Sequence, residues 1–114
     1  MLLPIVELIE QVKISINTIT AAEAAIKCKN EQGIMIDARE PVEYEKKAGI
    51  STINIPRGLL EMKMLQNYKN ENLAIFIHCA SGARAILAAE QLERIGYKNV
   101  WAITCTLEEV CLVC

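Results

Sequence analysis

The chain has 114 residues, of which 53% are apolar and 23% charged, so its length and composition predict one globular domain and exclude a disordered chain. The net charge is −2 and no stretch is strongly basic, which argues against nucleic acid or a membrane surface as a partner. Five irregularly spaced cysteines, with no secretory signal and no apolar run long enough to cross a bilayer, predict free thiols in a reducing cytoplasm.

The first predicted element is an amphipathic helix over residues 4–13, with Pro4 at its start. Its apolar side chains recur at helical spacing on one face: Ile5, Leu8, Ile9 and Val12. The polar face is net acidic, which disfavours a role on a membrane, so we expect the helix to pack onto the domain rather than to serve as a dimer contact. We therefore predict a helical extension over residues 1–16 and a domain over residues 17–114.

Strands and helices alternate along the rest of the chain. Strands are predicted over 15–19, 34–36, 50–55, 73–77 and 100–103, and helices over 20–29, 41–47, 59–64, 82–95 and from 106 onward. Capping boxes open two of these helices, at Thr20 with Glu23 and at Thr106 with Glu109. The alternation predicts an α/β fold with an open, mostly parallel sheet flanked by helices on both faces, plus the extra N-terminal helix.

In such a sheet, ligands bind outside the carboxyl ends of the strands. Several chemically capable residues follow predicted strands directly: Asp37, Arg57, Cys79 and Cys105. Asp37 and Arg39 fit either a solvated salt bridge or cap, or a structural pin beside the loop that contains Cys79.

The most informative stretch joins the central strand to helix 82–95. The buried run 73–77 is followed by Cys79, and Gly82 permits a tight turn before the helix begins. Cys79 should therefore face free backbone N–H groups and the positive end of the helix dipole, close to the charge of Arg84. These surroundings favour the thiolate, which is the nucleophilic form of cysteine.

Three stretches together resemble the rhodanese family, in particular its small single-domain members. They are Asp37-Ala-Arg39-Glu40-Pro41-Val-Glu43-Tyr44, Ile53-Asn54-Ile55-Pro56-Arg57-Gly58 and His78-Cys79-Ala80-Ser81-Gly82-Ala83-Arg84-Ala85. The motifs stand in the family's order, and the resemblance covers residues 17–110.

The resemblance implies a sulfurtransferase of the thiosulfate type that carries sulfane sulfur as a persulfide on Cys79, without a cofactor or metal. Its partners would be a small-molecule sulfur donor and a thiol, cyanide or protein acceptor. The loop Ala80, Ser81, Gly82, Ala83 and Arg84 would hold the substrate, and Arg84 matches the arginine of the family's C-x-x-G-x-R loop. Arg57, Arg39 and Asp37 are further candidates for the pocket.

The chain departs from the family pattern near the pocket rim. The family's Gly-His-Ile is replaced by Gly49-Ile50-Ser51, and Cys105-Thr106 stands where the family often has Gly-Gly. These departures keep open a second interpretation, a non-catalytic sulfur carrier or redox-sensing module. A cysteine phosphatase is a third, but such enzymes use H-C-x5-R, whereas this loop is one residue shorter. His78 should point away from Cys79, because neighbouring strand residues face opposite sides.

The other cysteines carry weaker predictions. Cys105 should end the last strand near Cys79, which makes it a candidate resolving thiol. Cys111 and Cys114 have C-x-x-C spacing, but without a second pair or a nearby histidine we predict no zinc site. Cys28 is expected on the inner face of its helix.

Overall fold

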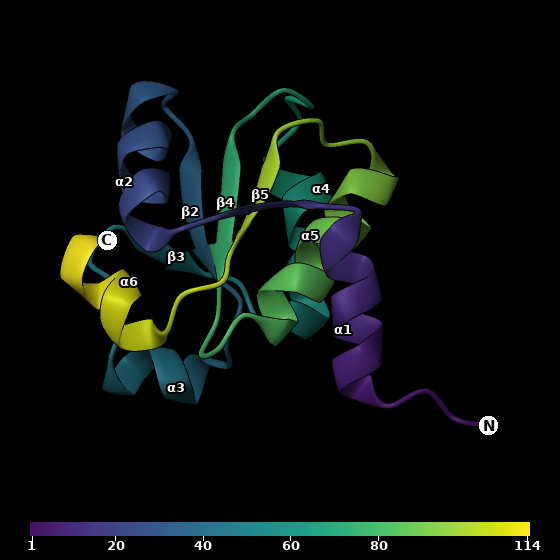
Figure 1. Cartoon of the computed structure of the whole chain (residues 1–114). Helices are drawn as coiled ribbons and strands as arrows, with labels where there is room; N and C mark the ends of the chain where they lie inside the picture. Colours follow the sequence, from purple (N-terminus) through teal and green to yellow (C-terminus); the bar gives the residue numbers. More distant parts are fainter.

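The computed structural model describes all 114 residues and is built around one sheet of five parallel strands (Figure 1). The strands are β1 (Asn17–Ile19), β2 (Ile34–Asp37), β3 (Thr52–Asn54), β4 (Ile75–His78) and β5 (Val100–Ile103). Their order across the sheet is β1-β5-β4-β2-β3. Since β4 lies in the middle, the chain leaves the centre of the sheet at the residue after His78.

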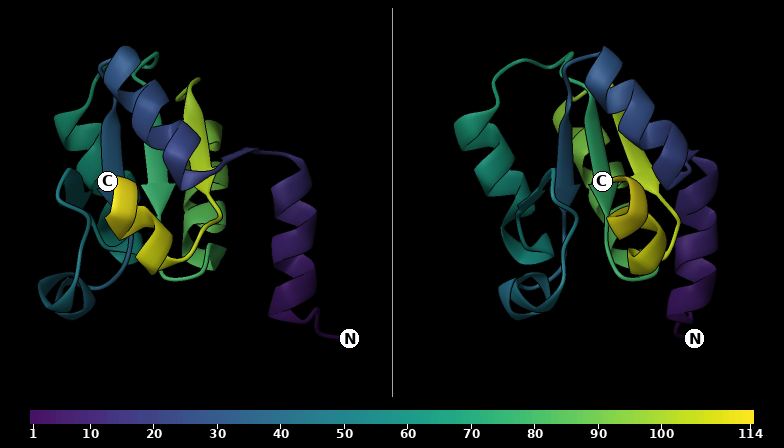
Figure 2. Two further views of the ribbon diagram at one scale, coloured as in Figure 1. Left: turned by 60° about the vertical axis from the view of Figure 1, so that its left-hand side comes forward. Right: turned by 90° about the vertical axis from the view of Figure 1, so that its left-hand side faces the viewer.

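The helices are α1 (Ile5–Ile14), α2 (Ala21–Asn30), α3 (Pro41–Lys46), α4 (Leu60–Asn67), α5 (Ala83–Ile95) and α6 (Leu107–Val113), with a 3-10 turn, η1 (Arg57–Leu59), before α4. Helices α4 and α5 cover one face of the sheet, and α1 lies outside α5 (Figures 1 and 2). Helices α2 and α6 cover the other face. The predicted parallel sheet, the helices on both faces and the extra N-terminal helix are confirmed.

The core has two parts because successive residues of a buried strand face opposite sides of the sheet. In β4, Ile75 and Ile77 pack in the cluster that contains α4 and α5, whereas Phe76 packs in the cluster that contains α2 and α6. All three side chains are fully buried. The continuous apolar run of β4 is thus explained by burial on both faces.

Of the two predicted capping boxes, the one at Thr106 with Glu109 forms in full, whereas at Thr20 only the half made by the Thr20 side chain forms. The Thr20 side chain accepts a hydrogen bond from the Glu23 N–H, and Thr106 accepts one from the Glu109 N–H. Each satisfies one of the backbone donors that a helix start leaves unpaired.

Four predicted boundaries are wrong by two residues or more. β1 starts at Asn17 instead of residue 15, because α1 continues to Ile14 and the Ser15 N–H closes a turn onto the Val12 carbonyl. β3 starts at Thr52 instead of residue 50, because residues 49–51 turn to meet the last residue of the chain, where the Ser51 N–H donates to the Cys114 carbonyl. β4 starts two residues late, because the Leu73 N–H closes a turn onto Asn70. α4 continues to Asn67, past its predicted end at residue 64.

None of the helices combines the length and the apolar character that crossing a membrane would require.

Candidate functional site

The site is the loop that connects the centre of the sheet to α5. β4 ends at His78, α5 begins at Ala83, and Gly82 is the N-cap with φ +105°. A Cβ at Gly82 would lie 3.5 Å from the nearest atom, which is ordinary contact. The positive φ, rather than crowding, is therefore what requires glycine here.

The Cys79 thiol faces into this loop. Its Sγ accepts a hydrogen bond from the Gly82 N–H at 3.1 Å, at the N-terminus of α5. A negative charge on this sulfur would be stabilised by that amide and by the helix dipole. The residue is only 1% exposed, so a reagent can reach Sγ only where the loop admits it.

Arg84 lies at the start of α5, and its guanidinium is paired rather than free. Nη1 donates to Glu43 Oε1 at 2.7 Å and Nη2 to Oε2 at 3.2 Å, a two-pronged contact between α5 and α3. The hydrogen bonds from Arg84, followed by the backbone N–H of Glu40, lower the pKa of Glu43 to about 2. Sequence reasoning gave Glu43 no role, although its place three residues after Glu40, the N-cap of α3, predicts a capping side chain.

Asp37, the last residue of β2, and Arg39 form a second pair in the interior, where Asp37 is in register with His78 of β4. Arg39 Nη2 lies 2.7 Å from Asp37 Oδ2, and the two side chains are 3% and 0% exposed. The same nitrogen also donates to the Lys47 carbonyl at 2.6 Å. The interpretation as a solvated salt bridge is therefore wrong, and the pair pins the end of β2 to the end of α3.

His78 packs beside this buried pair. Its Nε2 lies 3.6 Å from Asp37 Oδ2, too far for a hydrogen bond, and has no other partner. Burial lowers its pKa, with the Asp37 charge opposing that change. Asp37 belongs to the same face of the sheet as Met35, whereas Cys79 packs with the opposite cluster. The histidine thus lies on the far side of the strand from the thiol, as predicted.

Arg57 follows β3, at one edge of the sheet, and Cys105 follows β5, and the contacts of both side chains are with residues other than Cys79. Arg57 Nη1 is 2.8 Å from Glu61 Oε1. Cys105 Sγ accepts a hydrogen bond from the Ala21 N–H at 3.2 Å and packs with the α2 and α6 cluster. Its role as a resolving thiol stays a prediction.

Two of the remaining cysteines are held in the thiol form by their surroundings. Burial raises the pKa of Cys28 and of Cys114, and it is raised further by the charge of Glu31 at Cys28 and by neighbouring cysteines at Cys114. Cys28 lies on the inner face of α2, as predicted. Neither thiol has the amide donor that Cys79 has, so neither is favoured as the nucleophile.

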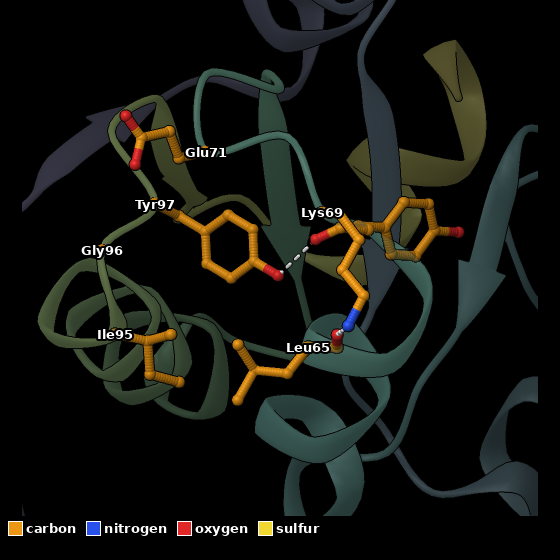
Figure 3. Close-up of a pocket in the computed structure, with 7 residues that line it drawn as sticks. Leu65, Lys69, Glu71, Ile95, Gly96 and Tyr97 are labelled. Atoms are coloured by element: carbon orange, nitrogen blue, oxygen red, sulfur yellow. Dashed lines mark hydrogen bonds between the residues drawn. The ribbon is translucent and has the colours of Figure 1, made fainter.

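Two hollows flank α5. One, of about 270 Å³, lies between α1 and the loop and includes Ile9, Ser81 and Ala83 in its lining. The other, of about 240 Å³, lies at the far end of α5, where the Tyr97 hydroxyl donates to the Tyr68 carbonyl at 2.7 Å (Figure 3). Only the first adjoins the loop of Cys79.

A family model described as "Rhodanese-like domain" matches residues 18–111. The chain belongs to the rhodanese-like domain family. This family assignment agrees with the resemblance drawn from the three motifs, and its span includes every strand except the first residue of β1.

Two curated relatives have names that state a role in sulfur chemistry. The chain is 39% identical over 66 residues to a Bacillus subtilis protein named "Putative sulfur carrier protein YrkF", a match that covers 58% of this chain and 35% of that protein. It is 30% identical over 78 residues to "Putative thiosulfate sulfurtransferase, mitochondrial" of Schizosaccharomyces pombe, covering 59% and 55%. The matches thus span only a third to about half of these relatives' length.

Among solved structures, the chain is similar to a protein of unknown function from Rhodopseudomonas palustris described as a "Possible Tyrosine Phosphatase". The TM-score is 0.80 at 24% identity, and the match covers 96% of this chain and 90% of that one. At this identity the likeness establishes the shared fold.

Proposed function

We propose that this rhodanese-like protein is a sulfurtransferase that carries sulfane sulfur as a persulfide on Cys79. The observation that carries the proposal is the hydrogen bond from the Gly82 N–H to Cys79 Sγ at the N-terminus of α5. The same arrangement that favours the thiolate also favours the negative charge of a persulfide. Membership of the family and the names of both curated relatives support sulfur handling.

The chemistry has two steps. The Cys79 thiolate attacks the outer sulfur of thiosulfate, the S–S bond of the donor breaks, and sulfite leaves with the bonding electron pair. In the second step a thiolate or cyanide attacks the terminal sulfur of the Cys79 persulfide. The sulfur moves to the acceptor and the Cys79 thiolate returns, so no external electron is needed. A protein thiol fits the role of acceptor equally, and a reducing cytoplasm would keep the thiols free.

A second candidate is a sulfur carrier or redox-sensing module without turnover. It is favoured by the burial of Cys79 and by the similarity to the carrier protein. Such a protein would take up one sulfur and release it only to a docked partner.

The test is mass spectrometry of the protein after incubation with thiosulfate. We expect a gain of one sulfur on Cys79, absence of the gain in Cys79→Ser, and retention in the matched control Cys105→Ser. Release of thiocyanate on addition of cyanide distinguishes turnover from carriage. An unmodified Cys79 under these conditions would contradict a sulfurtransferase of the thiosulfate type, and cleavage of a phosphate monoester would instead favour a phosphatase.

A further inference from the structure

The arginines at the carboxyl edge of the sheet all have carboxylate partners. Arg39 pairs with Asp37, Arg57 with Glu61, and Arg84 with Glu43. The sequence predicts that Arg84 holds the substrate and offers Arg57 and Arg39 as further candidates for the pocket. In the folded protein each of these positive charges is already paired with a carboxylate. The pairing therefore affects which sulfur donors the site accepts.

The decisive pair is Arg84 with Glu43, because Arg84 is the charged side chain of the loop itself. The two side chains are 36% and 34% exposed, so the pair lies at the rim rather than in the core. Both terminal nitrogens of the Arg84 guanidinium donate to the Glu43 carboxylate, at distances of 2.7 and 3.2 Å. Such a fork-to-fork contact is the strongest arrangement available to these two groups.

Glu43 is also held from its own helix. The backbone N–H of Glu40 donates to Glu43 Oε1 at 3.0 Å, closing the capping box of α3. The Glu43 carboxylate is thus fixed on two sides. With a pKa of about 2 it remains an anion at any pH at which Cys79 can react.

A donor that approaches Cys79 therefore meets a neutral pair, not a free cation. Thiosulfate carries two negative charges and must either displace Glu43 from Arg84 or bind beside its carboxylate. Both are unfavourable, and the penalty grows with each charge on the donor. An organic donor, in which the transferable sulfur is attached to a carbon-bound thiol or sulfonyl group, carries at most one charge there and avoids most of the penalty.

We propose that Glu43 is a specificity-determining residue that neutralises Arg84 and selects organic persulfide-type donors over doubly charged ones. The inference rests on the proposed function, since it names the class of donor for the Cys79 site. It assigns Glu43 no part in bond making.

The probes are thiosulfate and methanethiosulfonate, which present the same sulfane sulfur with two and one negative charges. With the second probe, the Cys79 thiolate attacks the outer sulfur and methanesulfinate leaves with the electron pair of the broken S–S bond. The measured quantity is the ratio of kcat/KM for thiosulfate to kcat/KM for methanethiosulfonate, with cyanide as acceptor.

In Glu43→Gln we expect this ratio to rise about fivefold, because one negative charge near the donor is lost. The amide keeps an oxygen for the Glu40 N–H. The matched control is Glu45→Gln, on the same helix and exposed, which changes the net charge equally and should leave the ratio unchanged. Glu43→Asp keeps the charge and should hold the ratio low.

An unchanged ratio in Glu43→Gln, or a selective loss of thiosulfate activity, would overturn the proposal, because Glu43 would then only position Arg84. If Glu43→Gln does not fold, the same ratio is measured on the wild-type protein at increasing salt concentration. The proposal requires that the ratio does not fall as salt screens the charges. A steep fall would overturn it, because it would show that a free Arg84 attracts the thiosulfate dianion. Failure of wild-type protein to take sulfur from either probe would instead contradict the proposed function.

Discussion

Two ion pairs that involve residues of the stretch 37–44 differ in nearly every physical respect. Asp37 with Arg39 is buried in the interior, whereas Glu43 with Arg84 lies at the rim of the Cys79 loop with each side chain about one-third exposed. The first joins the end of β2 to α3, and the second joins α3 to α5. Together they fix α3 to the sheet and then the loop of Cys79 to α3.

The difference teaches which pair should govern stability and which should govern chemistry. Separating buried charges leaves one of them unpaired in a medium of low dielectric constant, a large loss. An exposed pair is screened by water and contributes little to stability, so its charge is available to influence an approaching donor. The comparison predicts that mutations at the buried pair change mainly the free energy of unfolding, whereas mutations at the rim pair change mainly the preference between donors.

Asp37→Asn should have the largest effect on stability. It removes the carboxylate that holds the 3%-exposed Arg39 and leaves a buried positive charge without a partner. We expect a loss of about 3–5 kcal/mol in the free energy of unfolding, measured by urea denaturation. The rim variant Glu43→Gln is the control. A smaller loss for Asp37→Asn than for Glu43→Gln would break the comparison.

Gly82→Ala tests whether the loop between the two pairs needs its backbone conformation. The positive φ should make alanine destabilising by about 1–2 kcal/mol, and displacement of the Gly82 N–H from Sγ should slow sulfur uptake by about tenfold or more. Gly96→Ala is the matched control, because Gly96 also has a positive φ, +125°, but lies at the far end of α5.

We expect similar losses of stability in the two glycine variants, measured by urea denaturation, and slower persulfide formation only in Gly82→Ala, measured by mass spectrometry over time. Equal rates of persulfide formation would mean that the amide of Gly82 does not serve the sulfur.

The fold was predictable because its signals are local. A strand buried on both faces is continuously apolar, and a helix start is marked by its capping side chain, so β4 and the threonine caps of α2 and α6 follow from short stretches of sequence. The position of Cys79 followed in the same way, from a strand that ends before a glycine turn.

What escaped prediction depends on contacts between distant segments. Glu43 and Arg84 are 41 residues apart in sequence, and nothing within either motif indicates that α3 brings the carboxylate onto the guanidinium. The shortening of β3 depends likewise on the Cys114 carbonyl, which reaches Ser51 from the end of the chain. The burial of Cys79 depends on how the whole loop closes, which no single residue type specifies.

The rim pair should contribute a pH-dependent part of the free energy of unfolding, which a comparison of wild type with Glu43→Gln isolates. The folded pKa of Glu43, about 2, lies below the ordinary value of 4.5, so its contribution is present above about pH 4.5 and is lost as the pH falls toward 2. Because the carboxylate is one-third exposed, solvent screening limits the contribution to about 1 kcal/mol or less.

The measurement is the difference in unfolding free energy between wild type and Glu43→Gln, taken by urea denaturation across this range. A difference that grows as the pH falls would have the wrong sign and would contradict the assignment of the low pKa to this ion pair.

Mutation of the third pair, Arg57 with Glu61, should have the smallest effect on stability and on donor preference. It therefore serves as the reference against which the effects at the other two pairs are compared. Its side chains are four residues apart across η1 and the start of α4, and both are partly exposed. Pairs of this kind contribute about 0.3–0.5 kcal/mol, so Glu61→Gln should change the urea midpoint by little more than the error of the measurement. It should also leave the ratio of thiosulfate to methanethiosulfonate activity unchanged, since Arg57 does not belong to the loop of Cys79. A rise in that ratio as large as in Glu43→Gln would mean that donors respond to the charge of the whole edge rather than to the single carboxylate on Arg84.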